Sequence, residues 1–174
     1  ADDKTLFVAN IKGHGSLSPR RADQKGKNSR DRLGSVSIID VPDAAALAET
    51  CAEPLSDLAR QGIELFNEGA YYKCHDALEE AWVIDQGPGR DLYRGILQVG
   101  IAYYQIERGN YRGAVKMLLR VRQWLDPLPP ICRGVDVARL RVDAAQVYEA
   151  LLAAGEARLG AIDRRLFRPI RLVE

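Results

Sequence analysis

Two short stretches decide the fold: residues 69–74, which read GAYYKC, and residues 109–114, which read GNYRGA. Both begin with glycine and carry a tyrosine two positions later and a small residue five positions later. A glycine of this kind ends one helix, and the small residue lets the next helix pack closely against it. The repeated pattern is similar to that of tetratricopeptide repeats. With only two copies, it predicts two antiparallel helical hairpins side by side in a compact bundle rather than a long solenoid.

The spacing of apolar residues and the glycine and proline positions predict the helices around these hairpins. We expect helices over 43–68, with a break near Pro54, and over 70–85, 89–108, 111–126, 135–154 and 156–165. The fold class is therefore all-α, a bundle of about five to six helices built from antiparallel helical hairpins.

Residues 1–41 differ from the rest because they are rich in glycine and basic side chains and lack helical periodicity. Such a stretch buries too little apolar surface to order itself, so we expect a flexible basic arm, a processed segment or one introduced for expression. The apolar pieces at 6–8 and 36–41 could dock on the body or add a strand. This divides the chain into an arm, 1–41, and an all-α domain, 42–174.

The composition excludes several classes of protein. The 174 residues hold 25 Lys+Arg against 24 Asp+Glu, so the net charge of +1 argues against a polyanion-coating protein. No apolar run approaches the ~20 residues of a membrane span. Three cysteines without a CxxC pair argue against a disulfide framework and a Cys-rich zinc site, and favour a reducing compartment.

The helix over 70–85 carries the side chains best suited to bind a metal or take part in catalysis. His75 and Glu79 lie one helical turn apart, and Trp82 falls within the same 100° arc. The corresponding positions of the second hairpin are the apolar Val115 and Leu119, which places His75 and Glu79 on a core-facing side. Buried polar groups of this kind need partners.

The helix over 89–108 offers such partners. It is apolar on two sides, which predicts a central position, and a narrow polar stripe of Arg94, Gln98 and Gln105 runs between them. Arg94 could pair with Glu79 or Glu80, and Gln98 could hydrogen-bond His75.

The run FNEGAYYKCHDALEEAW at 66–82 resembles the signature of the DUF309 family, a domain of unknown function, and so do residues 93–98 and 109–114. Its His-xxx-Glu-xx-Trp/Tyr motif is met by His75, Glu79 and Trp82. The resemblance covers about residues 55–140 and implies a small all-α fold, with a suggested but unestablished metal site at the motif. Relatives often carry a second histidine where this chain has Gln105.

Three interpretations of the polar residues follow. His75 and Glu79 could hold a divalent metal, with further ligands from Glu80, Asp76, Gln98, Gln105, Cys74 or a second copy of the chain. Trp82, Arg94, Gln98 and Gln105 could line a pocket for a small ligand. His75, Glu79, Arg94 and Gln98 could instead form a satisfied buried network that only fixes helix register. A Cys74–His75 nucleophile is disfavoured because neighbouring side chains on a helix point about 100° apart.

Two classes of function stay open. The first is a metal- or ligand-binding protein, with or without enzymatic activity, working through the polar site. The second is a helical interaction module or complex subunit that binds a protein partner or a second copy. Nucleic acid is expected only at the 1–41 arm. The expected compartment is the cytoplasm, with the plastid stroma as the alternative.

Overall fold

The computed structural model describes residues 5–10, 35–40 and 44–173 of a chain that divides into two compact units, 1–43 and 44–174. In the first unit, strands β1 (Thr5–Asn10) and β2 (Ser35–Asp40) pair antiparallel, with Leu6 opposite Ile39. The apolar pieces expected to dock or add a strand thus pair with each other. The remaining parts of 1–41 lie outside the described residues, so the flexible arm stays a prediction.

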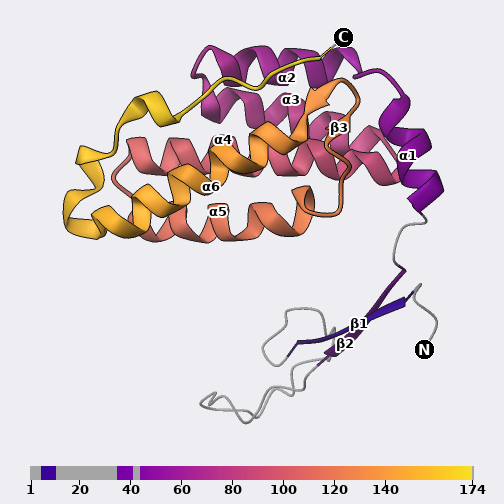
Figure 1. The fold of residues 1–174 in the computed structure, drawn as a ribbon, viewed down its shortest axis with the longest axis horizontal. Helices are drawn as coiled ribbons and strands as arrows, with labels where there is room; N and C mark the ends of the chain where they lie inside the picture. Colours follow the sequence, from indigo (N-terminus) through magenta and orange to yellow (C-terminus); the bar gives the residue numbers. More distant parts are fainter. Residues whose placement is uncertain (1–4, 11–34, 41–43, 174) are drawn as a thin grey trace, which may run out of the picture. The chain divides into compact units, whose positions relative to one another are not determined.

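The second unit confirms the all-α prediction (Figure 1). Its elements are α1 (Ala44–Ala52), α2 (Asp57–Asn67), α3 (Tyr71–Ile84), η1 (Pro88–Arg90), α4 (Asp91–Glu107), α5 (Tyr111–Leu125), β3 (Ile131–Cys132), β4 (Val135–Asp136), α6 (Val137–Ala154), η2 (Glu156–Ala161) and η3 (Arg164–Leu166). The predicted break near Pro54 separates α1 from α2. The short β3–β4 hairpin was not predicted, because two-residue strands carry no periodic signal.

The two repeated stretches form the turns of two helical hairpins, α2–α3 and α4–α5. Gly69 and Gly109 have φ of 81° and 74°, the left-handed conformation that glycine adopts without strain at a helix end. The small residue of the first hairpin, Cys74, packs so closely against α4 that a Cβ on Gly100 would lie 2.9 Å from its sulfur. Helix α4 packs against both α3 and α5, as its apolar sides predict (Figure 1).

Helix α6 packs across α5, and the C-terminal segment returns along α2 (Figure 1). Asn67, the last residue of α2, fastens this segment through two hydrogen bonds to Ile170. The Asn67 amide donates to the Ile170 carbonyl at 3.1 Å, and the Ile170 N–H donates to the Asn67 oxygen at 2.7 Å. Residues 103 positions apart are thereby held together.

A disulfide joins Cys51 and Cys132, although the cysteines were expected to form no disulfide framework and to favour a reducing compartment. It joins the end of α1 to β3 across 81 positions of sequence. The prediction failed because it rested on cysteine number and spacing, whereas pairing depends on which residues the fold brings together. Cys74 is left as a buried free thiol.

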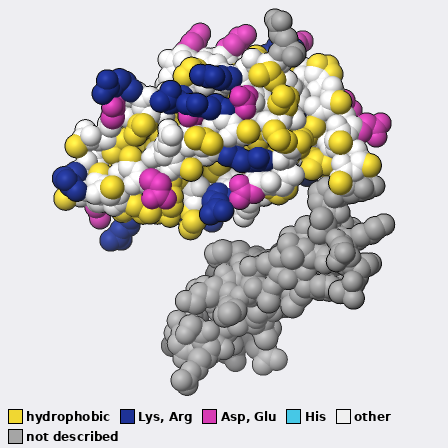
Figure 2. All heavy atoms as spheres, viewed as in Figure 1, with side chains coloured by type: hydrophobic (Ala, Val, Ile, Leu, Met, Phe, Trp, Pro, Cys, Tyr) yellow, Lys and Arg dark blue, Asp and Glu magenta, His cyan; other side chains and the backbone are white. Residues whose placement is uncertain are grey.

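Figure 2 shows the face seen in Figure 1, where Lys and Arg side chains and Asp and Glu side chains are interspersed with hydrophobic ones. This mixture agrees with the nearly balanced charge of the sequence. Within the described ranges, no helix combines the length and the apolar character needed to cross a membrane.

Candidate functional site

The candidate site is centred on Arg94, which lies in the first turns of α4. Its guanidinium carbon is 4.2 Å from the ring centroid of Trp82 and 4.3 Å from that of Trp124. Trp82 comes from the end of α3 and Trp124 from the end of α5. Because both helices run antiparallel to α4, their ends meet its beginning, and the two indoles clamp the guanidinium.

This indole clamp, defined by Trp82, Arg94 and Trp124, holds the arginine in a fixed orientation. A cation–π contact contributes about 0.5–2 kcal/mol, depending on how far it is removed from water. Two such contacts leave the edges of the planar guanidinium, where its N–H donors lie, free to make hydrogen bonds. Across the described part of the chain, these donors make no hydrogen bond or ion pair.

A second arginine lies beside the clamp. The guanidinium carbon of Arg90 is 4.9 Å from the Trp82 ring centroid, and its Nη1 donates to the Asp85 carbonyl at 3.3 Å. The neighbouring acid is Asp91, whose pKa is raised by burial, while the charges of Arg90 and Arg94 oppose that rise. Positive charge therefore exceeds negative charge at this end of α4.

Three buried polar atoms in this region lack hydrogen-bond partners among the described residues: Nε1 of Trp82, Nε1 of Trp124 and Oε1 of Gln98. Gln98 lies one turn after Arg94 on the same side of α4. Unpaired buried polar atoms are uncommon in folded proteins and mark places where water or a ligand supplies the missing bond. Gln105 is different, because its side chain accepts from Asn110 at 2.8 Å beside the turn into α5.

The structure corrects the expected burial of His75 and Glu79. The His75 side chain is 33% exposed and the Glu79 side chain 57% exposed. Leu119, taken as the apolar counterpart of Glu79, is itself 58% exposed, whereas His75 and its counterpart Val115 are partly buried, so this side of both hairpins lies at the edge of the core. The repeat was recognised correctly, but the direction of its faces was not.

The expected pairings around these residues are also absent. Arg94 contacts the two indoles rather than Glu79 or Glu80, and the His75 ring lies 3.3 Å from Asp76 and 3.8 Å from Glu79. These solvent-exposed contacts contribute little to folding. The buried network of His75, Glu79, Arg94 and Gln98 is therefore not formed.

A metal does not fit the same residues. His75 and Glu79 offer one nitrogen and one carboxylate from a single exposed helical face, whereas a tightly held zinc requires at least three protein ligands. The described residues contain no group of three or more His, Cys, Asp or Glu side chains that could hold a metal ion. The prediction of a metal at His75 and Glu79 is thus unsupported.

The sequence did not predict two members of the site, Trp124 and Arg90, because their place depends on how three helix ends meet. The antiparallel arrangement contained the missing signal. If the helix over 111–126 runs back along the helix over 89–108, its last turn must lie beside Arg94.

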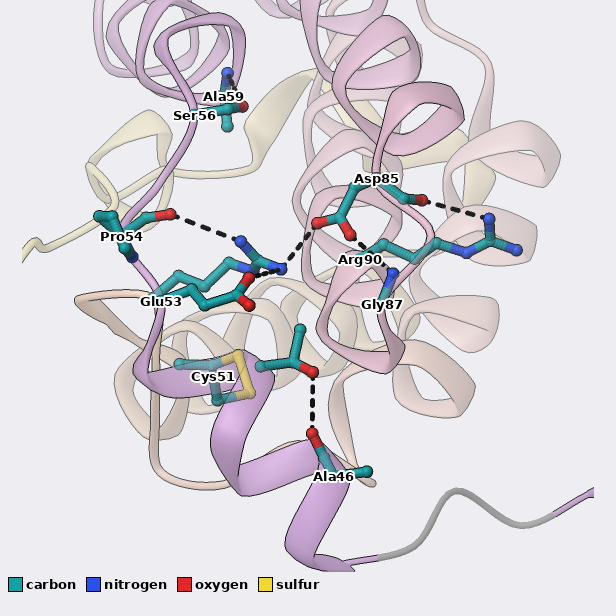
Figure 3. Close-up of polar contacts among 12 residues, drawn as sticks. Ala46, Cys51, Glu53, Pro54, Ser56, Ala59, Asp85, Gly87 and Arg90 are labelled. Atoms are coloured by element: carbon teal, nitrogen blue, oxygen red, sulfur yellow. Dashed lines mark hydrogen bonds and ion pairs between the residues drawn. A yellow bond between two sulfur atoms is a disulfide. The ribbon is translucent and has the colours of Figure 1, made fainter.

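A buried charge centre beside the connection between α3 and α4 was also missed. Arg133 lies in the turn between β3 and β4, and its side chain is 5% exposed. Its Nη2 is 2.8 Å from an Asp85 oxygen and 3.2 Å from a Glu53 oxygen, and Nη1 donates to the Pro54 carbonyl at 3.4 Å (Figure 3). These contacts neutralise the guanidinium inside the fold.

The backbone of Arg133 is strained. Its φ is 52°, and the next residue, Gly134, has a φ of 75°. Positive φ at both central residues is the pattern of tight hairpin turns that favour Asn-Gly, and left-handed geometry costs a non-glycine residue about 1–2 kcal/mol. An arginine persists here because its side chain makes the buried contacts with Asp85 and Glu53.

A groove of about 380 Å³ lies between α5 and α6. Its lining is mainly apolar and includes Leu119 and Val142, which are 58% and 50% exposed. Two arginines and two acids complete it: Arg122, Asp126, Arg141 and Glu149.

Comparison with known proteins identifies the region that contains most of the candidate site. Residues 59–117 match the model of the DUF309 family, described as a domain of unknown function. Trp82, Arg94 and Gln98 lie inside this range, whereas Trp124 lies beyond it.

An uncharacterized protein of Aquifex aeolicus (strain VF5) is 23% identical to this chain over 93 residues. The match covers 53% of this chain but only 28% of that relative, so the chain corresponds to less than a third of the relative's length. The match of residues 59–117, which run from α2 into α5, to the DUF309 model confirms the resemblance drawn from the sequence.

Proposed function

We propose that this protein binds a small anionic ligand, a carboxylate or a phosphate, through Arg94. The observation that carries the proposal is a guanidinium held between two indole rings with its hydrogen-bond donors unpaired among the described residues. Arginine presents a planar fork of donors that matches the oxygens of carboxylate and phosphate groups. A fork already held in place loses little side-chain freedom when the ligand binds.

The surroundings of the clamp support an anion rather than a cation. Arg90 adds a second positive charge beside Trp82, and the indole N–H groups are further donors. Asp91 opposes binding through its negative charge, but burial raises its pKa and so disfavours that charge. Gln98 would contribute an acceptor to a hydroxyl or amide group on the ligand.

Other functions gain less support. A metal-dependent reaction is not supported, because the exposed pair His75 and Glu79 offers too few ligands to hold a catalytic metal. An interaction module would use the groove between α5 and α6, whose lining is mainly apolar. Nothing in that lining points to a ligand as directly as the unpaired donors of Arg94 do. For the compartment we propose the cytoplasm or the plastid stroma, under conditions that allow the Cys51–Cys132 disulfide to form.

Titration with inorganic phosphate, sulfate and citrate, followed by intrinsic fluorescence, tests the proposal. Both tryptophans of the chain flank Arg94, so the emission reports on the clamp. We expect saturable binding of at least one anion. Arg94→Gln should weaken binding about 10-fold to 100-fold, the effect of losing charged hydrogen bonds of about 1.5–3 kcal/mol.

Arg112→Gln is the matched control, because it removes one positive charge from an exposed position of α5 and should leave the affinity unchanged. Asp91→Asn should strengthen binding by removing the opposing charge. Saturation with the same affinity in the parent and the Arg94→Gln protein, or no saturation by any of the three anions, would contradict the proposal. Circular dichroism of each variant establishes that it is folded.

A further inference from the structure

The disulfide lies at one end of a chain of contacts that leads to the indole clamp. Two segments, 50–54 and 131–134, are joined in three ways. The Cys51–Cys132 bond is covalent, the Arg133 N–H donates to the Cys51 carbonyl at 2.6 Å, and the Arg133 guanidinium contacts Glu53 and Pro54. The disulfide therefore fixes the position from which the Arg133 side chain enters the fold.

From Arg133 the contacts continue into the connection between α3 and α4. Its guanidinium pairs with Asp85 at 2.8 Å, and the other Asp85 oxygen accepts from the Gly87 N–H at 2.8 Å (Figure 3). The Asp85 carbonyl accepts from Arg90, whose guanidinium lies over Trp82. Arg133 thus holds the connection that positions one arginine and, through Trp82, one wall of the clamp.

Packing of α1 supports the same connection. The methyl group of Thr50, the residue before Cys51, would lie 2.7 Å from a Cβ on Gly87 and 3.0 Å from one on Gly89. The backbone of the connection can approach Thr50 this closely only because glycine has no side chain. The end of α1 that carries Cys51 is therefore in direct contact with the α3–α4 connection.

We propose that reduction of the Cys51–Cys132 disulfide weakens anion binding at Arg94. The inference rests on the proposed function, because it assigns a regulation to the same site. With the covalent bond gone, the strained turn and the buried guanidinium of Arg133 lose the constraint that holds them at Asp85. The connection then loosens, and Arg90 and Trp82 are no longer held in the binding arrangement.

The reductant is a dithiol, either a small molecule or a protein with a reactive cysteine pair. Its thiolate attacks the sulfur of Cys51, a residue that is 7% exposed where Cys132 is fully buried, and displaces the Cys132 thiolate. The second thiol of the reductant then attacks the mixed disulfide and releases Cys51. Two electrons and two protons pass to the protein, which ends with two thiols, while the reductant ends as a disulfide.

The test compares the full chain before and after treatment with dithiothreitol, with alkylation and mass spectrometry to count free thiols. Phosphate, sulfate and citrate titrations followed by tryptophan fluorescence give the affinity in each state. Hydrogen exchange of residues 85–94 and 131–134 reports whether the contacts have opened. We expect a several-fold loss of affinity on reduction together with faster exchange in both segments.

Arg133→Gln provides a second route that keeps the disulfide. It removes the link to Asp85, so it should weaken anion binding to a similar degree and abolish most of the further effect of reduction. Arg122→Gln is its control, because the Arg122 side chain pairs, among the described residues, with Asp126 on the exposed side of α5. Circular dichroism distinguishes local opening from global unfolding, and a reduced protein that unfolds throughout would overturn the inference.

The outcomes separate this inference from the proposed function. Equal affinity in the oxidised and fully reduced protein overturns the regulation and leaves anion binding intact. If no anion binds in either state, the proposed function fails. In that case unchanged exchange at 85–94 on reduction overturns the coupling as well, whereas faster exchange there shows that the contact chain exists without the ligand.

Discussion

At the scale of single residues, two arginines show how surroundings decide what one side chain can do. Arg133 is enclosed by Asp85 and Glu53, so its charge is already matched and it acts as a structural link. Arg94 faces aromatic rings, which hold it in place without matching its charge through hydrogen bonds. The sequence identified Arg94 as a candidate from its position on a polar stripe. It could not identify its partners, because they depend on how three helix ends meet.

Cys74 gives a prediction at this scale. The thiol is fully buried, its sulfur donates to the Tyr71 carbonyl at 3.0 Å, and burial raises its pKa to about 12. At pH 8 only about one thiol in 10⁴ would be ionised, and the thiolate is the reactive form. A disulfide-exchange reagent added at pH 8 to the native, oxidised protein should label no thiol, and addition of urea should release one. Rapid labelling of the native protein would contradict the buried position.

At the scale of elements, the sequence predicted the helices well where glycine and proline mark their ends. Gly69 and Gly109 end α2 and α4, and the break at Pro54 separates α1 from α2. The β3–β4 hairpin was missed because strands of two residues are too short to show a periodic pattern. The burial of His75 and Glu79 was misjudged because helical periodicity gives the relative direction of side chains but not which direction faces the core.

The contact between α4 and α5 gives a prediction at this scale. A Cβ on Gly95 would lie 2.2 Å from one Leu125 methyl carbon and 2.7 Å from its Cγ, and Leu125 is fully buried. Gly95→Ala should lower the free energy of unfolding by about 1–3 kcal/mol, although alanine favours the helix itself. Urea denaturation measures the change.

Gly160→Ala is the control for that experiment, because a Cβ at this position meets no atom within 4 Å. It should leave the urea midpoint nearly unchanged. Equal stability of the parent and the Gly95→Ala protein would mean that α4 and α5 can separate without cost, contrary to the packing described.

At the scale of the whole molecule, the disulfide is the feature that was hardest to predict from the sequence. Cys51 and Cys132 are 81 positions apart and meet only because α1 and the β3–β4 hairpin both pack beside the α3–α4 connection. An odd number of cysteines in a chain of ordinary composition gives no indication of that meeting. Pairing is a property of the finished fold, as is the assembly of the indole clamp.

Replacing both bridged cysteines with alanine tests the stability that the bridge provides. Closing a loop of this length restricts the unfolded chain by about 4 kcal/mol in the entropic treatment, and measured effects are commonly about 2–4 kcal/mol. We therefore expect Cys51→Ala/Cys132→Ala to lower the free energy of unfolding by about 2–4 kcal/mol, measured by urea denaturation without reductant. Adding dithiothreitol should destabilise the parent by a similar amount and leave the double variant unaffected.

The hydrogen bonds between Asn67 and Ile170 bear on what kind of unit the family region is. The matched stretch ends at residue 117. Asn67 lies inside it, yet its hydrogen-bond partner Ile170 lies more than fifty positions beyond that end. A protein cut at the limits of the match would lose that partner, the whole of α6 and the Trp124 wall of the clamp. The matched span is thus shorter than the unit that folds, and an expressed fragment should extend to the C-terminal segment.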